Sequence, residues 1–264
     1  MSLDLLLQQA AAQDTLTIPA GWGQGRATYG GLVAGLLYSR LLATLGDAGK
    51  DRVLRSATVS FIGAVAAGEI TLTTEIFRSG KSVTQAEARL IQNGEVQAVL
   101  LASFGAARSS SIHVASLPAP PFKPADEIKP WPYIAGIVPE FLQQLDLRWT
   151  SGATPFSGAD KPDFSGWMRW REDFSQLTTA HLFALIDAWP PSVLGMFKTL
   201  APASSLCWTL ELLATPEGKS SQNWWQYRVE TDIAKDGYGH AVAHIWDDAG
   251  NLVAISRQTV TIFA

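Results

Sequence analysis

An internal repeat constrains the fold of this chain more than any single motif does. Residues 78–104, RSGKSVTQAEARLIQNGEVQAVLLASF, align with residues 235–260, KDGYGHAVAHIWDDAGNLVAISRQTV, with one residue of slippage. Each copy predicts a long strand, a glycine turn and a return strand. A further strand precedes each copy, at residues 56–65 and 205–214, and a helical run precedes that strand. This order predicts two equal modules, each made of a helix and an antiparallel sheet.

The helical run of the first module indicates how the helix and the sheet of a module pack together. Residues 31–45, GLVAGLLYSRLLATL, are apolar on nearly every face, which predicts a helix that is buried on most sides. The segments that follow are rich in β-branched residues and are separated by glycine turns, a pattern typical of antiparallel hairpins. We therefore expect an α+β fold in which each sheet curves around a central helix.

Proline divides the chain between the two modules. The segment SLPAPPFKPADEIKPWP holds much of the proline in the chain, and proline cannot donate to the hydrogen-bond ladder of a sheet. We predict an N-terminal module at residues 1–110, a linker at 111–142 and a C-terminal module at 143–264.

Charge and cysteine content exclude several classes of protein. The formal net charge of -4 provides no basic stripe, which disfavours nucleic-acid binding. The single cysteine, Cys207, excludes an internal disulfide framework, and Asp4 stands where a signal peptide would carry positive charge. No apolar run approaches the length of a membrane span. We expect a soluble, cytoplasmic protein.

Asp187 is the most anomalous charged residue. It lies in LFALIDAW, among apolar neighbours and near the end of a predicted helix, where the helix dipole disfavours an anion. It could cap the following turn or pair with an arginine. It could equally act as a general base, because partial burial raises the basicity of a carboxylate.

Gln258 and Ser205 are two further candidates. In LVAISRQTVTIF, a period of two places Gln258 on the apolar face of its strand, where a buried amide needs partners. It could form a structural hydrogen bond, or it could position a water or a carbonyl oxygen. Ser205 opens the strand SLCWTLELL in phase with Cys207, opposite the apolar set, so its hydroxyl turns inward only if the strand twists or bulges at its start.

Other chemical motifs are weak. The stretch GWGQGR does not lie between a parallel strand and its helix, as a dinucleotide loop would. His240 and His244 lie in a strand pattern, and the histidines form no ligand cluster. Cys207 in an apolar strand is typical of a small buried side chain. We expect no metal and no cofactor.

Several segments resemble the acyl-CoA thioesterase II (TesB-like) family, which belongs to the thioesterase-like superfamily and contains two hotdog modules in one chain. In the first module, YGGLVAGLLYSRLLATLG resembles the helix of this family, and FRSGKSVTQAEARLIQNGEV resembles its hairpin. In the second module, LIDAW, SSLCWTLELL and AISRQTV resemble the segments that hold the catalytic residues of the family. The resemblance implies a double hotdog with Asp187, Ser205 and Gln258 as the catalytic residues. Ser205 stands where many members carry threonine.

The resemblance implies hydrolysis of a fatty acyl-CoA or related thioester by direct water attack. Asp187 would accept the proton, Ser205 and Gln258 would hold the water, and the amides of Gly30 and Gly31 would bind the substrate oxygen. A noncatalytic acyl-CoA or lipid-binding protein is an alternative. An enoyl-CoA hydratase is a weaker one, since we see no Asp and His pair near a helix N-terminus. A homodimer or higher homo-oligomer is expected.

Overall fold

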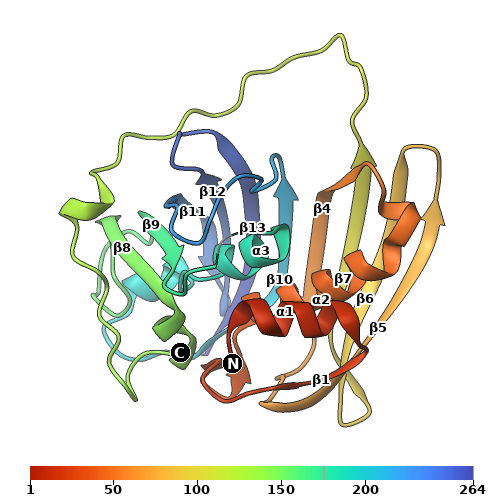
Figure 1. Cartoon of the computed structure of the whole chain (residues 1–264). Coiled ribbons are helices and arrows are strands. Elements are labelled where there is room, and N and C mark those ends of the chain that lie inside the picture. Colours follow the sequence, from red (N-terminus) through yellow and green to blue (C-terminus); the bar gives the residue numbers. More distant parts are fainter. Residues whose placement is uncertain (175, 264) are drawn as a thin grey trace.

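The computed structural model describes residues 1–174 and 176–263, and within them eleven strands form one antiparallel sheet (Figure 1). The strand order is β1-β5-β6-β7-β4-β10-β13-β12-β11-β9-β8. The two halves of the sheet meet where β4 (Arg52–Phe61) pairs with β10 (Ala203–Leu212). Each half follows the predicted repeat, and the two repeated hairpins lie in one continuous sheet with β4 and β10 between them.

The remaining strands divide between the two halves. In the N-terminal half they are β1 (Thr15–Ile18), β5 (Gly68–Ser79), β6 (Val83–Gln92) and β7 (Glu95–Ala106). In the C-terminal half they are β8 (Leu145–Gly152), β9 (Phe164–Trp170), β11 (Trp225–Lys235), β12 (Tyr238–Trp246) and β13 (Leu252–Ile262). A separate small hairpin consists of β2 (Gly23–Gln24) and β3 (Ala27–Thr28).

Two α-helices, α2 (Gly30–Leu45) and α3 (Thr179–Ile186), lie against the concave face of the sheet, and α1 (Leu3–Ala12) packs mainly on α2 (Figure 1). Most of α2 is buried, as predicted from its sequence. Short 3-10 turns occur at η1 (Gly46–Gly49), η2 (Ala125–Glu127), η3 (Glu140–Gln144) and η4 (Ser192–Met196). The predicted α+β double hotdog is confirmed, with one helix of the repeat in each module.

The two repeat helices pack closely because they meet at small residues. A Cβ added at Gly31 would lie 2.6 Å from the backbone oxygen of Ala184, and one added at Gly35 would lie 3.2 Å from that of Ala180. The order of these contacts shows that α2 and α3 run antiparallel. As a result, the N-terminus of α2 lies beside the C-terminus of α3, and Asp187 follows directly after that C-terminus.

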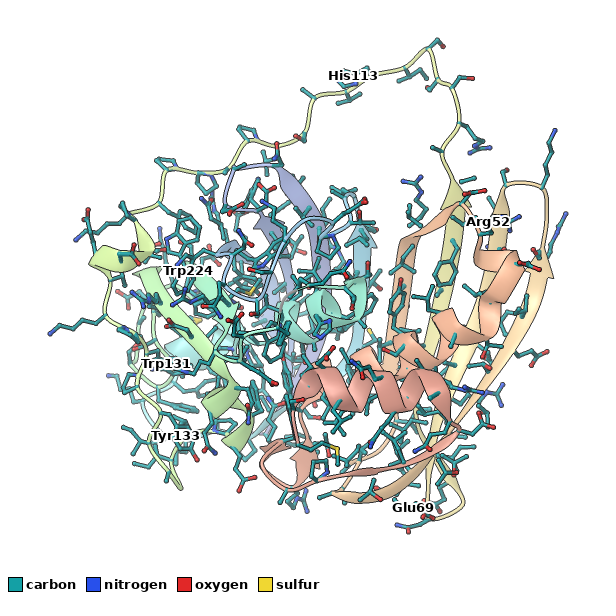
Figure 2. The ribbon with its side chains drawn as sticks, in the orientation of Figure 1. Arg52, Glu69, His113, Trp131, Tyr133 and Trp224 are labelled. Atoms are coloured by element: carbon teal, nitrogen blue, oxygen red, sulfur yellow. The ribbon has the colours of Figure 1, made fainter. Side chains whose placement is uncertain are left out.

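The proline-rich connection crosses the molecule at its periphery. It has no helix or strand from residue 107 to residue 124, and His113 lies on the arc that it forms away from the sheet (Figure 2). Its later part packs on the C-terminal half, where the Trp246 indole donates to Leu117 O at 3.0 Å and Trp131 N donates to Leu147 O at 2.7 Å. The division at residues 110 and 142 stays a prediction, because the sheet itself is continuous.

No helix in the described part of the chain is long and apolar enough to cross a membrane.

Candidate active site

Three residues that are far apart in the sequence form one hydrogen-bonded group. Asp187 is the C-cap of α3, Ser205 lies at the start of β10, and Gln258 lies in β13. The amide nitrogen Nε2 of Gln258 donates to Oδ1 of Asp187 at 3.0 Å and to Oγ of Ser205 at 3.0 Å. The structure therefore brings together all three of the predicted catalytic side chains.

A β-bulge turns Ser205 toward the other two residues. The register between β10 and β13 shifts between Ser205 and Cys207, where Ser205 pairs with Val260 and Trp208 pairs with Gln258. Paired residues in neighbouring strands share a face of the sheet. Ser205 therefore lies on the same face as Gln258, although the simple alternation of the sequence placed it opposite the apolar side. The bulge that this orientation requires is present.

Gln258 occupies the inner face that its phase predicted. Its neighbours on that face, Val260 and Ser256, are buried, and Ser256 accepts a hydrogen bond from the Trp208 indole at 2.8 Å. Both hydrogens of the Gln258 amide group are available for its two bonds, to Asp187 and to Ser205. Gln258 thus connects the carboxylate to the hydroxyl and fixes the distance between them.

Asp187 is enclosed by protein except where it faces a cleft. Burial raises its pKa from 3.8 to about 7, while the hydrogen bonds from Gln258 and from the backbone of Gly31 act in the opposite direction. Among the described residues, no arginine or lysine forms an ion pair with Asp187. Pairing with an arginine, one of the structural roles considered above, is therefore excluded. A carboxylate with this pKa can accept a proton at neutral pH.

The N-terminus of α2 is built around Asp187. A Cβ at Gly30 would lie 2.8 Å from Asp187 Oδ2, so glycine is needed for this approach. The Tyr29 hydroxyl, which is fully buried, donates to the backbone oxygen of Ala184 and ties the start of α2 to the last turn of α3. The Tyr29 ring also stacks on Phe141, with centroids 3.9 Å apart. These contacts hold the two helix ends in fixed relation.

A cleft of about 110 Å³ opens beside the three residues. Gly30, Asp187, Ser205 and Gln258 contribute to its wall. The other lining residues are mainly apolar or small: Gln24, Ala27, Thr28, Val33, Phe61, Gly63, Val65, Trp189, Pro191, Ala203 and Ser204. An electrophilic group entering this cleft would meet a basic carboxylate and a hydroxyl on one side and apolar side chains on the other.

The N-terminal copy lacks the same polar set. Leu54 precedes the bulge of β4 as Ser205 precedes that of β10, and Ala102 aligns with Gln258 in the repeated sequences. Leu54 is 2% exposed and Ala102 is 4% exposed, so both are core residues. The two halves therefore share the repeated strands, but only the C-terminal half carries the polar residues of the candidate site.

An Asp and His pair does occur at a helix N-terminus, contrary to our expectation. His181 Nε2 lies 3.4 Å from Asp4 Oδ1, near the N-terminus of α3. The other ring nitrogen of His181 accepts the backbone N–H of Thr178 at 3.2 Å in a capping box. Burial lowers the pKa of His181. Sequence separation hid this pair, in which Nε2 of His181 connects α3 to α1 while the other ring nitrogen bonds to the N-cap of α3 itself.

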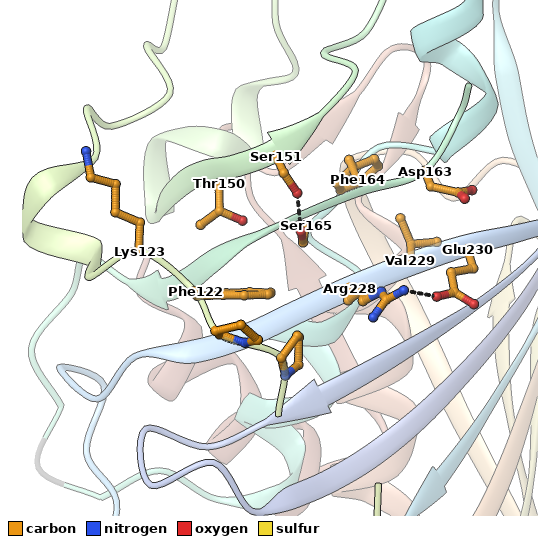
Figure 3. A pocket seen from close by; sticks show the side chains of 12 residues that line it. Phe122, Lys123, Thr150, Ser151, Asp163, Phe164, Ser165, Arg228, Val229 and Glu230 are labelled. Atoms are coloured by element: carbon orange, nitrogen blue, oxygen red, sulfur yellow. Dashed lines mark hydrogen bonds and ion pairs between the residues drawn. The ribbon is translucent and has the colours of Figure 1, made fainter. Parts of the chain in front are cut away.

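A larger pocket lies elsewhere, under the proline-rich connection (Figure 3). It has a volume of about 360 Å³ and is lined by Phe122 and Lys123 together with residues of β8, β9 and β11. Two pairs of its polar side chains bond to each other, Ser151 with Ser165 and Arg228 with Glu230. None of the predicted site residues lines it, so we place the candidate site in the smaller cleft.

The described residues also hold no cluster of three or more potential metal ligands. His240 Nδ1 lies 3.2 Å from the Thr259 hydroxyl, a hydrogen bond between neighbouring strands.

Comparison with family models identifies both halves of the chain. Residues 18–105 match the acyl-CoA thioesterase N-terminal domain, and residues 114–262 match the acyl-CoA thioesterase C-terminal domain. The chain belongs to the acyl-CoA thioesterase family. The resemblance to TesB-like thioesterases is thereby confirmed, and Asp187, Ser205 and Gln258 all lie within the C-terminal domain of this thioesterase-family chain.

Solved structures agree on the fold of this thioesterase-family member. A conserved protein of unknown function with a hot dog fold from Alicyclobacillus acidocaldarius is 21% identical, with a TM-score of 0.82 and 98% of each chain covered. The acyl-CoA thioesterase II TesB2 from Mycobacterium marinum is 19% identical, with a TM-score of 0.72 over 99% of this chain and 98% of the other. A search of curated protein sequences gives no match.

Two features of the site were missed from the sequence. Tyr29 precedes the glycine pair, and its anchoring role depends on a contact with Ala184, 155 residues away. Trp189 lies two residues after Asp187, and a pattern search treats it as one of ten tryptophans. The one feature of the sequence that could have marked Trp189 as a site residue is its position near Asp187 in an apolar segment.

Proposed function

We propose that this protein hydrolyses an acyl-CoA thioester to a free acid and CoA by direct attack of water. The observation that supports this most is the bonded group Asp187–Gln258–Ser205 in a cleft with polar and apolar walls, with a pKa of about 7 for its carboxyl. The family membership supports the same class of reaction. A fatty acyl-CoA or a related thioester is the proposed substrate.

Asp187 is the proposed general base. As a water molecule attacks the carbonyl carbon, its proton moves to the Asp187 carboxylate and a new C–O bond forms. The tetrahedral intermediate then collapses as the C–S bond breaks, and the departing thiolate can take up the same proton. A pKa near 7 suits both steps, because the group accepts and returns a proton at neutral pH.

Ser205 and Gln258 are the proposed positioning groups for the water. Ser205 Oγ accepts from Gln258, which leaves the hydroxyl hydrogen free to reach into the cleft. Gln258 holds Asp187 and Ser205 on either side of its amide nitrogen. Such fixed placement lowers the entropic cost of reaction and can contribute several kcal/mol.

Gly30 and Gly31 are the proposed source of oxyanion stabilisation. Both lie in the first turn of α2, where backbone N–H groups and the helix dipole favour negative charge. The backbone of Gly31 also acts on the Asp187 carboxyl, whose pKa it lowers. In this proposal, the amides at the start of α2 face the charge that develops on the thioester oxygen while Asp187 takes up the proton of the water.

Product analysis tests the function directly. The protein is incubated with acetyl-, butyryl-, octanoyl- and palmitoyl-CoA and with crotonyl-CoA as the enoyl substrate. Release of free thiol supports the thioesterase. Loss of enoyl absorbance without thiol release would indicate a hydratase instead, a candidate that the Asp4–His181 pair keeps in the test. Thermal stabilisation without any product would favour a noncatalytic acyl-CoA or lipid-binding protein.

We also propose that the protein forms a homodimer or higher homo-oligomer. Val53 and Val83 both pair with Gly105, so their exposed side chains share the outer face of the sheet with exposed Leu101. Light scattering after size exclusion tests this, and a monomer at all concentrations would contradict it.

Fatty acid metabolism in the cytoplasm is the proposed cellular setting of the reaction. Fractionation of cells would test the location of the protein.

A further inference from the structure

The cleft beside Asp187 is small for a site that receives an acyl group. Its volume is about 110 Å³, whereas small-molecule sites commonly enclose about 300–1,000 Å³. A space of this size holds only a small number of groups of the size of water. The bulk of a coenzyme can remain outside the cleft, but the acyl carbons must enter it.

The space that adjoins the cleft at Gln258 and Pro191 is smaller still. Beyond Gln258 and Pro191 lies a further space of about 20 Å³, lined by Val193, Tyr227, Val229 and neighbouring residues of β12 and β13. That volume suits about one group of the size of water. An acyl chain that passed Gln258 would therefore meet the packed core.

Trp189 is the largest side chain in the wall of the cleft, and it is held firmly. It is 5% exposed, its ring meets Trp149 edge to face at 5.0 Å, and it stacks on Tyr227 at 5.5 Å. Its indole nitrogen donates to Met168 Sδ at 3.3 Å. Aromatic pairs of this kind restrain the orientation of a ring.

Gly166 explains why Trp189 cannot retreat into the sheet. A Cβ at residue 166 would lie 2.3 Å from Cη2 of Trp189, so the indole rests directly on the bare backbone of β9. The ring has the cleft on one side and this backbone on another. Movement away from the cleft would require a shift of the strand, which interior packing opposes.

We propose that Trp189 limits the substrate to a short acyl group, because the cleft is small and the indole rests on the backbone of β9. This inference rests on the proposed function and names its substrate class. Trp189 acts as a specificity-determining residue that closes the far end of the acyl site. The apolar side chains of Val33 and Val65 then line the space left for the short chain.

The test compares Trp189→Leu with Trp149→Leu. Both changes remove an indole from the same aromatic cluster, but Trp149 is absent from the cleft wall. Thiol release is measured with acyl-CoAs of two to sixteen carbons. Binding of S-ethyl-, S-butyl- and S-octyl-CoA thioethers, which cannot be hydrolysed, is measured by calorimetry on the same proteins. Melting temperatures show that each variant folds, and the milder Trp189→Phe and Trp149→Phe pair replaces any variant that does not.

For the wild type we expect kcat/KM to fall at least tenfold from butyryl- to octanoyl-CoA, and S-butyl-CoA to bind at least tenfold more tightly than S-octyl-CoA. Trp189→Leu should raise the octanoyl to butyryl ratio at least tenfold, while Trp149→Leu leaves it within about threefold. Equal or better use of palmitoyl-CoA by the wild type would overturn the inference. Thioether binding without turnover, with the same chain-length preference, would remove the proposed hydrolysis but retain the short acyl site. Binding of none of the thioethers, without turnover, would overturn both.

Discussion

Gly30 and Asp187 approach each other so closely that no side chain fits between them. A Cβ at Gly30 would lie 2.8 Å from Asp187 Oδ2 and 3.2 Å from Cζ of Phe61. This contact couples the first residue of α2 to the residue that ends α3, across the interface of the two modules. The position of the carboxylate is therefore set by the packing of the modules as well as by its own helix.

Gly30→Ala should lower turnover at least tenfold with little loss of stability. Alanine favours the helix over glycine by up to about 1 kcal/mol, but its methyl group would displace the Asp187 carboxylate. The measurement is kcat for thiol release together with the melting temperature. Gly80→Ala is the matched control, since a Cβ there meets Val83 O at an ordinary 3.6 Å. Full activity in Gly30→Ala would show that this close approach does not matter.

Asp187→Asn should stabilise the fold increasingly as pH rises. The folded pKa of Asp187 is raised from 3.8 to about 7, so the folded state favours the protonated form. The resulting stabilisation is complete below pH 3.8 and is lost as pH rises to about 7. The melting temperature of the variant minus that of the wild type should therefore grow from pH 4 to pH 7 and then level off. A constant difference would mean that the pKa of Asp187 is not raised.

Gln258→Glu should move the pH profile of catalysis to higher pH. In the wild type, kcat/KM should rise through a pKa of about 7, because Asp187 must be ionised to accept a proton. The substitution removes the Nε2 donor to Asp187 and adds a second carboxyl at a distance of about 3 Å, and both changes raise the pKa of Asp187. Rates measured from pH 5.5 to pH 9 test this. Gln258→Met separates the loss of the donor from the added charge, and should shift the profile less.

Tyr29→Phe should destabilise the protein and slow the reaction. It leaves the buried carbonyl of Ala184 without its donor, at a cost of about 1–3 kcal/mol. It also loosens the link between the helix ends that orient Asp187. Tyr38→Phe is the control, because Tyr38 is a buried tyrosine of the same helix that stacks on Phe183 away from the cleft. Equal loss of turnover in the two variants would assign Tyr29 a purely structural role.

The sequence predicts the fold well because the strands of each repeat copy and the apolar helix can each be recognised within a short segment. The phase of Gln258 could be counted along β13, and the structure confirms that it faces inward. The orientation of Ser205 could not be predicted by counting along β10, because it depends on a bulge that is seen only in the pairing with β13. A period-two count assumes an uninterrupted strand.

Contacts between distant segments account for what the sequence could not predict. Asp4 and His181 are separated by most of the chain, so nothing local indicates their pairing. The burial that raises the pKa of Asp187 likewise depends on α2, which flanks it only after both modules have packed together. A charge among apolar neighbours, the phase of a strand and the family resemblance identified the residues, whereas their chemistry depends on the assembled fold.

The most direct test of the central claim is the rate of CoA thiol release by Asp187→Asn and by the wild type at pH 8, with butyryl-CoA as substrate. Asparagine keeps the shape of the side chain but cannot accept the proton of the attacking water. We predict a folded variant whose kcat is at least about a thousandfold lower, consistent with the contribution of a general base. A variant that retains the wild-type rate would contradict the account and remove Asp187 from the mechanism.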